Sequence, residues 1–274
     1  MTRPSQQLDA ALRFHAEGEE GPWVTLVHGG LAGASSWRHA TLALARWARV
    51  LTYDLRGYGD NRAAPTPHTI AQHADDLVAV WDAARIERSH LVGFSMGGMI
   101  AQQAALDFHA RVDRLVLEST AARIGAQSAA AFHERAAALE GPAGAEALDA
   151  HVSVAFCDWF LAEQPEAVAR YRREVAATDA AVAAHNFRAI AAFDRSADLH
   201  ALHAPTLVLA GAEDPGMGAD KAAELAELIP GAEARVVPRL GHTLHVEAPS
   251  TFTYLLADFL LFEGGPAGDP DRRS

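Results

Sequence analysis

Short apolar runs alternate with longer stretches of helical periodicity along most of this chain. Each run is four or five residues long and carries Val, Leu or Thr, and most of the runs end at Gly, Asp or Ser. Because this alternation is typical of a parallel sheet covered by helices, we predict an α/β fold. The expected buried strands are residues 24–27, 50–53, 90–93, 114–117 and 206–210, with a shorter run at 234–237 and an antiparallel edge strand at 11–15.

Helices are expected between these strands, where apolar residues recur at helical spacing. Residues 69–85 have this periodicity, and Thr69 occupies the position expected for an N-cap. A second helical stretch stops before Pro230-Gly231, a pair that cannot continue a helix. This second stretch is residues 219–229, and the further segments predicted as helices are residues 99–108 and 250–262.

One long insertion interrupts the alternation. Residues 121–203 contain only Ala-rich helical segments, broken at Gly141-Pro142 and Pro165. This much helix between two strands implies a separate cap over one edge of the sheet. We therefore predict a core formed by residues 1–120 and 204–262, a helical cap at 121–203, and a disordered Gly/Pro/Asp/Arg-rich tail at 263–274.

Composition and charge narrow the class of protein. Hydrophobic residues make up 50% of the 274-residue chain, which excludes a mostly disordered protein. The net charge of −12 is offset by no basic cluster, so we expect no nucleic-acid partner. A single cysteine, Cys157, excludes an intramolecular disulfide and a Cys-rich zinc site. The apolar stretches are strand-sized and no secretory signal is evident, so we expect a cytoplasmic protein without a membrane partner.

The strongest local motif is Gly93-Phe94-Ser95-Met96-Gly97-Gly98. It follows an apolar run directly and opens a helical stretch, and in that context G-x-S-x-G is a nucleophile elbow. Such an elbow is a strained turn, and side chains at its glycines would collide with neighbouring backbone. The alternative, a glycine-rich turn with an idle serine, is disfavoured by the strand and helix on either side.

A serine needs a base and an orienting acid to act as a nucleophile. In this arrangement both follow the serine in the chain, the acid first and the histidine second. Asp214 lies just beyond the expected strand 206–210, and His242 lies just beyond 234–237. Because Ser95 also follows the carboxyl end of a strand, we predict that the three side chains meet on one rim of the sheet.

Neighbouring residues compete for the roles of base and acid. His245 would share a helical face with His242, but His242 follows the strand more closely and comes directly after Gly. Glu213 precedes Asp214, and in an extended segment its side chain would point the opposite way. Glu118 ends another strand, where some hydrolases place the acid. We favour Asp214 and expect Glu118 to be a rim or surface group.

We expect two backbone N–H groups to form an oxyanion hole, which would stabilise the negatively charged oxygen of a tetrahedral intermediate. The first belongs to Met96, at the start of a helix, where unpaired N–H groups and the helix dipole favour negative charge. The second comes from the loop His28-Gly29-Gly30-Leu31, where two glycines let the backbone approach a substrate closely. We choose Gly30 as this donor and interpret His28 as a hydrogen-bonding prop for the loop.

Apolar and basic side chains near these motifs are candidates for a substrate pocket. The predicted lining residues are Leu31, Phe94, Arg123, Trp159 and Phe187. If the substrate carries a carboxylate, a cap arginine should bind it, and the candidates are Arg123, Arg135 and Arg188. A metal site formed by His68, His73, Asp75 and Asp76 is not expected, because His73 and Asp75 cannot share a helix face.

These motifs together resemble the α/β-hydrolase superfamily, over nearly the whole chain apart from the tail. They are His28-Gly29-Gly30, Asp54-Leu55-Arg56-Gly57-Tyr58-Gly59, Gly93-Phe94-Ser95-Met96-Gly97-Gly98, Gly211-Ala212-Glu213-Asp214 and Gly241-His242. The resemblance implies a mostly parallel eight-stranded sheet with a helical cap between strands six and seven. It also implies Ser95, Asp214 and His242 as a catalytic triad, and no cofactor.

Within that superfamily the chain is most similar to 3-oxoadipate enol-lactonases and their relatives. The similarity rests on Thr69-Ile70 through His73-Ala74-Asp75-Asp76-Leu77, on Thr120-Ala121-Ala122-Arg123-Ile124-Gly125 and on Asp198-Leu199. Two departures stand out. Asp60-Asn61 follows Gly59 where a small hydroxyl residue is usual, and Pro215-Gly216 follows Asp214 where Thr-Pro-Pro is common. These departures leave the triad intact and the substrate open.

The sequence therefore predicts a serine hydrolase that cleaves a carboxylic ester or a small lactone, such as an enol-lactone, through an acyl-serine intermediate. A C–C bond hydrolase, a perhydrolase and a natural-product methylesterase are alternatives on the same triad. A non-catalytic ligand-binding protein, and a lyase or cyclase that uses His242 as a base without acylation, are alternatives of other classes. The expected partner is a small-molecule substrate, and a homodimer stays open.

Overall fold

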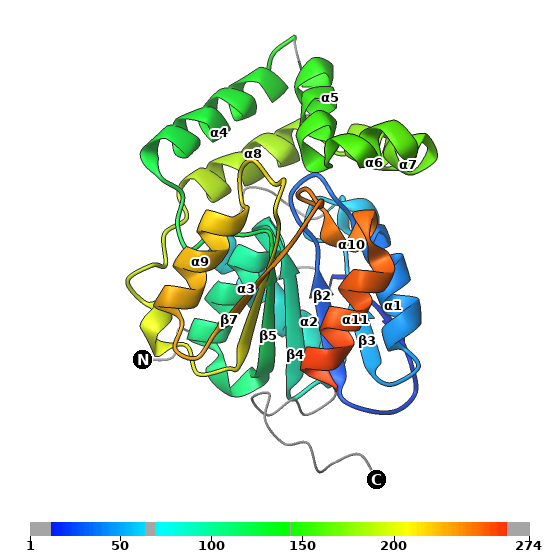
Figure 1. The fold of residues 1–274 in the computed structure, drawn as a ribbon, viewed down its shortest axis with the longest axis vertical. Coiled ribbons are helices and arrows are strands. Elements are labelled where there is room, and N and C mark those ends of the chain that lie inside the picture. The colour runs from blue at the N-terminus through cyan, green and yellow to red at the C-terminus, as the bar shows by residue number, and fades with distance from the viewer. Residues whose placement is uncertain (1–11, 64–68, 143, 262–274) are drawn as a thin grey trace.

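A seven-stranded sheet forms the centre of the molecule (Figure 1). This computed structural model describes residues 12–63, 69–142 and 144–261. The strand order is β1-β3-β2-β4-β5-β6-β7, and only β1 runs antiparallel to its neighbour. The strands are β1 (His15–Glu17), β2 (Trp23–Val27), β3 (Arg49–Thr52), β4 (Ser89–Phe94), β5 (Val112–Glu118), β6 (Thr206–Gly211) and β7 (Glu233–Val237).

The six strands predicted in parallel are present within two residues of their expected bounds, and the edge strand is displaced. It was expected at residues 11–15 but begins at His15; residue 11 lies outside the described part of the chain. The side chain of Asn61 accepts from the N–H of Arg13 at 2.8 Å and donates to its carbonyl oxygen at 3.0 Å. Because the Asn61 side chain binds both the N–H and the carbonyl oxygen of Arg13, these groups are not available for pairing with a neighbouring strand. The described residues hold seven strands where the resemblance implied eight.

Helices connect the strands as expected. They are α1 (Arg38–Leu44), α2 (Ile70–Ala83), α3 (Met96–Asp107), α4 (Ala126–Leu139), α5 (Gly144–Ala155), α6 (Asp158–Glu163), α7 (Pro165–Ala176), α8 (Ala180–Ala191), α9 (Ala219–Leu228), α10 (Leu244–Glu247) and α11 (Pro249–Leu260), with the short 3-10 turns η1 (Ala34–Trp37), η2 (Gly59–Asn61), η3 (His109–Arg111) and η4 (Leu199–Ala201). The start of α2 is the predicted one: Thr69 and Gln72 form a capping box. Among the described residues, no helix has both the length and the apolar character needed to cross a membrane.

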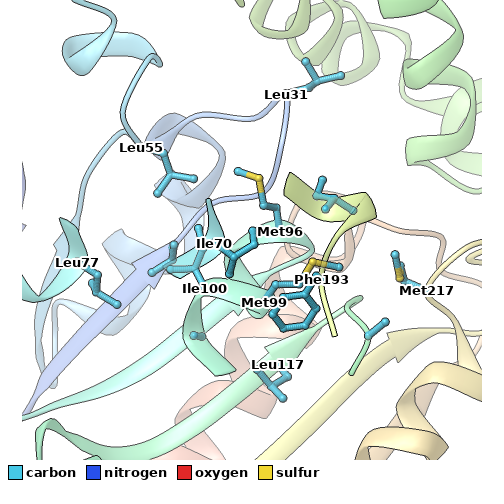
Figure 2. Packing of buried hydrophobic residues seen from close by; sticks show 14 of the residues in the cluster. Leu31, Leu55, Ile70, Leu77, Met96, Met99, Ile100, Leu117, Phe193 and Met217 are labelled. Atoms are coloured by element: carbon cyan, nitrogen blue, oxygen red, sulfur yellow. The ribbon is translucent and has the colours of Figure 1, made fainter. Parts of the chain in front are cut away.

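Alternate residues of the strands enter two separate hydrophobic clusters, one on each face of the sheet. On one face, Leu91 and Leu117 pack with residues of α2, α3 and α9. On the other face, Val92 and Val116 pack with residues of α1 and α11. Figure 2 shows the first cluster, to which Met99 of α3 and Phe193 both belong. The sheet is therefore covered on both sides, and the carboxyl ends of its strands are the edge left for a site.

Helices α4 to α8 lie between β5 and β6 in the chain and stand over one end of the sheet (Figure 1). The segments that lead into and out of these helices lie side by side. The N–H of Ile124 donates to the carbonyl of Phe193 at 3.0 Å, and Arg123 forms an isolated antiparallel bridge with Asp194. Apart from that bridge, the described part of 121–203 contains no β-structure. The division into a core and a cap domain stays a prediction, and residues 263–274 lie outside the described chain.

Candidate active site

The segment from β4 to α3 forms a sharp turn at Ser95. This residue has φ 53° and ψ −115°, a conformation that few non-glycine residues adopt. Its N–H donates to the carbonyl of Glu118 at 2.8 Å, which ties the turn to the end of the neighbouring strand. A Cβ atom at Gly93 would overlap with the carbonyl oxygen of Gly97, and one at Gly97 would overlap with that of Val27. The sequence forms this turn because neither flanking position carries a side chain.

Replacing Gly93 by alanine should lower the free energy of unfolding by about 2–3 kcal/mol, the scale of an overpacked core. The reason is that the overlapping group is backbone, which cannot rotate away. Urea denaturation of the purified variant measures this loss. Gly141→Ala is the matched control, because a Cβ atom there would lie in ordinary contact, 3.5 Å from the carbonyl oxygen of Ala137. Equal midpoints for the two variants would contradict the steric argument.

Three side chains from separate loops meet at this turn. The Nε2 atom of His242 lies 3.1 Å from the hydroxyl oxygen of Ser95, and its Nδ1 atom lies 2.7 Å from Oδ2 of Asp214. The other carboxylate oxygen of Asp214 accepts from the N–H groups of Gly216 and Met217, each at 2.9 Å. The predicted serine, histidine and aspartate therefore form one continuous hydrogen-bonded chain.

Burial and neighbouring charges have opposite effects on the pKa values of His242 and Asp214. Burial alone would lower the pKa of His242, but the Asp214 carboxylate beside it, aided by Glu118 and Glu247, raises that pKa above its ordinary value. Burial would likewise raise the pKa of Asp214, but the His242 ring and two backbone N–H donors hold it below the usual range. Asp214 is thus kept ionised, and its charge stabilises a protonated His242.

Glu118 and His245, the alternative candidates for the acid and the base, form a hydrogen-bonded pair with each other. His245 Nδ1 lies 2.8 Å from Oε1 of Glu118, and the backbone N–H of His245 donates to the same oxygen at 3.1 Å. Both side chains are buried, and the ring of Phe94 lies against both His245 and His242. The expectation that Glu118 is a rim or surface group is wrong, because β5 ends inside the molecule, where His245 covers this carboxylate. Glu213 is exposed.

The loop after β2 lies beside Ser95. Gly30 lines the same cavity as Ser95, and Met96 begins α3, where helix geometry leaves N–H groups without intrahelical acceptors. His28 holds this loop, because its Nε2 accepts from the N–H of Leu55 and its Nδ1–H donates to the carbonyl of Gly29, both at 2.8 Å. Burial lowers the pKa of His28, so the ring stays neutral. The assignment of Gly30 and Met96 as oxyanion donors stays a prediction.

A cavity of about 290 Å³ opens at Ser95 and His242, beneath helices α4, α5 and α8. Of the five predicted pocket residues, Phe187 lines it and the other four do not. Leu31 and Phe94 are buried in the hydrophobic clusters, Arg123 forms an ion pair with Glu224, and the indole N–H of Trp159 donates to the carbonyl of Arg239.

The cationic side chain among the lining residues of this cavity is Arg135 of α4, which also contacts the ring of Phe132. Among the described residues, no carboxylate forms an ion pair with Arg135. Arg188, a predicted alternative, instead forms a two-point contact with Glu140 outside the cavity. Of the three arginines predicted as carboxylate ligands, Arg135 therefore lines the cavity, and Arg123 and Arg188 do not.

His151 of α5 also lines the cavity, although it is not among the site residues predicted from the sequence. Burial, with His242 and Arg135 nearby, lowers its pKa to about 3, so the imidazole is neutral. Its Nε2 lies 3.2 Å from the hydroxyl of Tyr171, and its Nδ1 has no hydrogen-bond partner among the described residues. No motif surrounds His151, and only the packing of the helices reveals its position.

No cluster suited to a metal ion occurs in the described part of the chain. Asp76, one of the residues considered for such a site, forms a buried two-point ion pair with Arg56 at 2.7 and 2.8 Å. His68 lies outside the described residues.

The fold and this arrangement of loops agree with a comparison against known families. The family described as "alpha/beta hydrolase fold" matches residues 22–249. The chain therefore belongs to the α/β-hydrolase family, as the resemblance in its motifs implied.

Individual relatives cover most of the chain. A protein of Variovorax paradoxus named carbamate hydrolase RutD is 32% identical over 93% of this chain and 98% of its own length. The 3-oxoadipate enol-lactonase 2 of Acinetobacter baylyi is 29% identical over 75% of this chain and 76% of its own length. The crystal structure of the enol-lactonase from Burkholderia xenovorans LB400 superposes with a TM-score of 0.86, at 30% identity, over 91% of this chain and 96% of that one.

Proposed function

We propose that this chain is a serine hydrolase that cleaves a small ester or lactone through an acyl-serine intermediate. One observation carries the proposal: the 3.1 Å contact from Ser95 to His242 continues through a 2.7 Å contact to Asp214. The three groups lie within the distances that proton transfer and imidazole orientation require. They also line one cavity, so a bound substrate would meet the serine hydroxyl directly.

In the acylation step, His242 Nε2 takes the hydroxyl proton while the Ser95 oxygen forms a bond to the substrate carbonyl carbon. Asp214 holds the imidazole with Nδ1 protonated and stabilises the positive charge that the ring acquires. The carbonyl oxygen becomes an oxyanion, which the N–H groups of Gly30 and Met96 stabilise. The bond to the leaving oxygen then breaks, and this oxygen takes the proton from His242.

In the deacylation step, His242 takes a proton from water as the water oxygen attacks the acyl carbon. The bond between that carbon and the Ser95 oxygen breaks, and the serine oxygen recovers the proton from His242. The products are the free acid and, for an ester, a separate alcohol. With a lactone, the alcohol or enol stays attached to the acyl chain, so one hydroxy acid or its keto form is released.

The cavity favours a compact substrate with a negative charge. Its volume of about 290 Å³ lies at the small end of the range for ligand pockets. Met99, Phe187 and Ile190 supply an apolar wall, and Arg135 supplies a cation at the same cavity. Guanidinium groups bind carboxylates in a two-point geometry. We therefore propose an acyl group that carries a carboxylate, a chemistry compatible with the enol-lactonase names of two relatives.

Replacing Arg135 by methionine should raise KM about 10-fold for a carboxylate-bearing ester and leave KM for its neutral methyl-capped analogue unchanged. The loss corresponds to about 1.5 kcal/mol for a hydrogen bond to a charged group. Steady-state kinetics on the matched pair of esters measures it. Arg188→Met is the control, because that guanidinium pairs with Glu140 away from the cavity. A loss of the same size for both esters would refute a charge-specific role.

Carbamate hydrolysis is the second candidate, and the relatives named carbamate hydrolase favour it. The same steps apply, because a carbamate presents a carbonyl carbon to Ser95 and releases an alcohol or an amine. The two candidates differ in the acyl-enzyme, which for a carbamate is a carbamoyl-serine when the alcohol leaves and an alkoxycarbonyl-serine when the amine leaves.

The test begins with a fluorophosphonate probe, which should label Ser95 and no other residue, as peptide mass spectrometry would identify. Turnover is then measured on a panel of matched compounds: an enol-lactone, a saturated lactone, a simple ester and a carbamate. The highest kcat/KM should belong to the lactones or the ester. Labelling absent at Ser95 would overturn the proposal, and a highest kcat/KM on the carbamate would select the second candidate.

A further inference from the structure

A buried carboxylate of α10 holds the loop on which His242 lies. The Glu247 side chain is 5% exposed, and its oxygens accept from the N–H groups on both sides of His242. Gly241 donates to Oε2 at 3.0 Å and to Oε1 at 3.2 Å, and Thr243 donates to Oε1 at 3.1 Å. One carboxylate thus fixes the two peptide groups that set the position of the histidine.

The same carboxylate reaches the helices above the sheet. Oε2 of Glu247 also accepts from the N–H of Cys157 at 3.1 Å, at the corner between α5 and α6. Two more hydrogen bonds join this corner to the loop: Thr243 Oγ1 donates to the carbonyl of Ala155 at 2.9 Å, and Trp159 donates to the carbonyl of Arg239 at 2.6 Å. A Cβ atom at Gly241 would collide with this corner, so the two backbones are in direct contact.

We propose that Glu247 is a positioning residue for the reaction: it holds His242 at Ser95 and fixes the α5–α6 corner to the loop that carries His242. This inference rests on the proposed role of His242 as the general base. Glu247 does not line the cavity, so it acts on the reaction through the loop that it holds and through its charge.

A carboxylate suits this position better than any neutral side chain of the same shape. All of its partners are donors: the N–H groups of Gly241, Thr243 and Cys157, and the Thr243 hydroxyl at 3.4 Å. An ionised carboxylate offers only acceptors, so it can satisfy all of them. A glutamine would turn an NH₂ group toward at least one of these donors and leave that donor without an acceptor in a buried place. We therefore expect a glutamine at position 247 to displace the loop that carries His242.

Glu247 also affects the titration of His242. The ionisable groups that face His242 are Asp214 from the β6–α9 loop, Glu118 from β5, Glu247 from α10 and His151 from α5. Asp214, Glu118 and Glu247 raise the pKa of His242, and neutral His151 contributes little charge. Removing the charge of Glu247 should therefore lower this pKa. His242 must be neutral to accept a proton, so kcat/KM falls at low pH as His242 becomes protonated. This fall, the acidic limb of the pH profile of kcat/KM, should therefore move to lower pH.

The experiment compares Glu247→Gln, Glu247→Asp and the control Glu213→Gln in the full chain. Glu213 is an exposed carboxylate on the same rim, so its change removes one charge without disturbing the loop. For Glu247→Gln we expect kcat to fall about 10- to 100-fold with little change in KM, as for small misplacements of reacting groups. The acidic limb should shift downward in pH. Hydrogen–deuterium exchange should rise in peptides that cover 153–161 and 238–248.

Glu247→Asp keeps the charge but shortens the reach, so its acidic limb should stay near that of the wild type while kcat falls. This variant and the thermal midpoints separate positioning from general loss of stability. A fall in kcat without a shift of the limb would reduce Glu247 to a structural role, and Glu247→Gln kinetics equal to those of Glu213→Gln would overturn the assignment. If the wild-type protein neither hydrolysed any compound of the panel nor reacted with the fluorophosphonate probe at Ser95, the proposed function itself would be wrong.

Discussion

Replacing Ser95 by alanine should lower kcat by about 10⁶-fold, the loss seen when the nucleophile of a serine triad is removed. The reason is that His242 and Asp214 then have no hydroxyl to activate, although their own 2.7 Å contact is kept. KM should change little, because the lining of the cavity is otherwise intact. Steady-state kinetics on the best compound of the panel, with a discontinuous assay for the slow variant, measures the loss.

Ser119→Ala is a matched control for Ser95→Ala. Both serines directly follow a parallel strand and both have a positive φ, 53° for Ser95 and 47° for Ser119. The hydroxyl of Ser119 is buried and has no hydrogen-bond partner among the described residues, so its removal should leave turnover near the wild-type level. Residual turnover of Ser95→Ala within about 10-fold of wild type would exclude an acyl-serine mechanism.

The sequence predicts the meeting of Ser95, Asp214 and His242 because their positions depend on strand ends alone. Parallel strands place their carboxyl ends on one edge, so a residue just beyond each strand is placed without knowledge of any helix. Asp214 follows β6 and His242 follows β7, and both lie within hydrogen-bond reach as expected.

The lining of the cavity could not be predicted in the same way. Arg135, His151 and Phe187 come from three helices of the inserted segment, and their approach to Ser95 depends on how these helices pack. No local motif encodes that packing. Nearness in sequence is also a poor guide to the lining of the cavity. Phe94 directly precedes Ser95, but side chains alternate along a strand, and Phe94 joins the cluster on the face covered by α1 and α11. Its ring contacts His242 there without lining the cavity.

The paired rivals show another limit of sequence reasoning. From the sequence, Glu118 is a separate alternative for the acid and His245 a separate alternative for the base, because each residue is placed only by its own strand or helix. In the fold they satisfy each other, 2.8 Å apart in a buried site. Such pairing between residues distant in sequence is visible only in three dimensions.

Replacing Asp214 by asparagine should lower kcat by about 10⁴-fold, the loss expected when a triad imidazole is held in the wrong tautomer. The asparagine amide would present an N–H₂ group to Nδ1, which favours protonation at Nε2, the atom that must accept the serine proton. The pKa of His242 is raised by Asp214, so this change should also lower it and move the acidic limb of kcat/KM to lower pH. A pH series of single-turnover rates measures both effects.

Glu118→Gln tests whether the other buried carboxylate shares this role. Its nearest histidine is His245, and it reaches His242 only through space, as one of several charges that raise the pKa of that ring. We therefore expect Glu118→Gln to shift the acidic limb slightly downward and to lower kcat far less than Asp214→Asn does. If Glu118→Gln were the more damaging change while both variants stayed folded by circular dichroism, the acid would lie on β5, and Asp214 would only orient its loop.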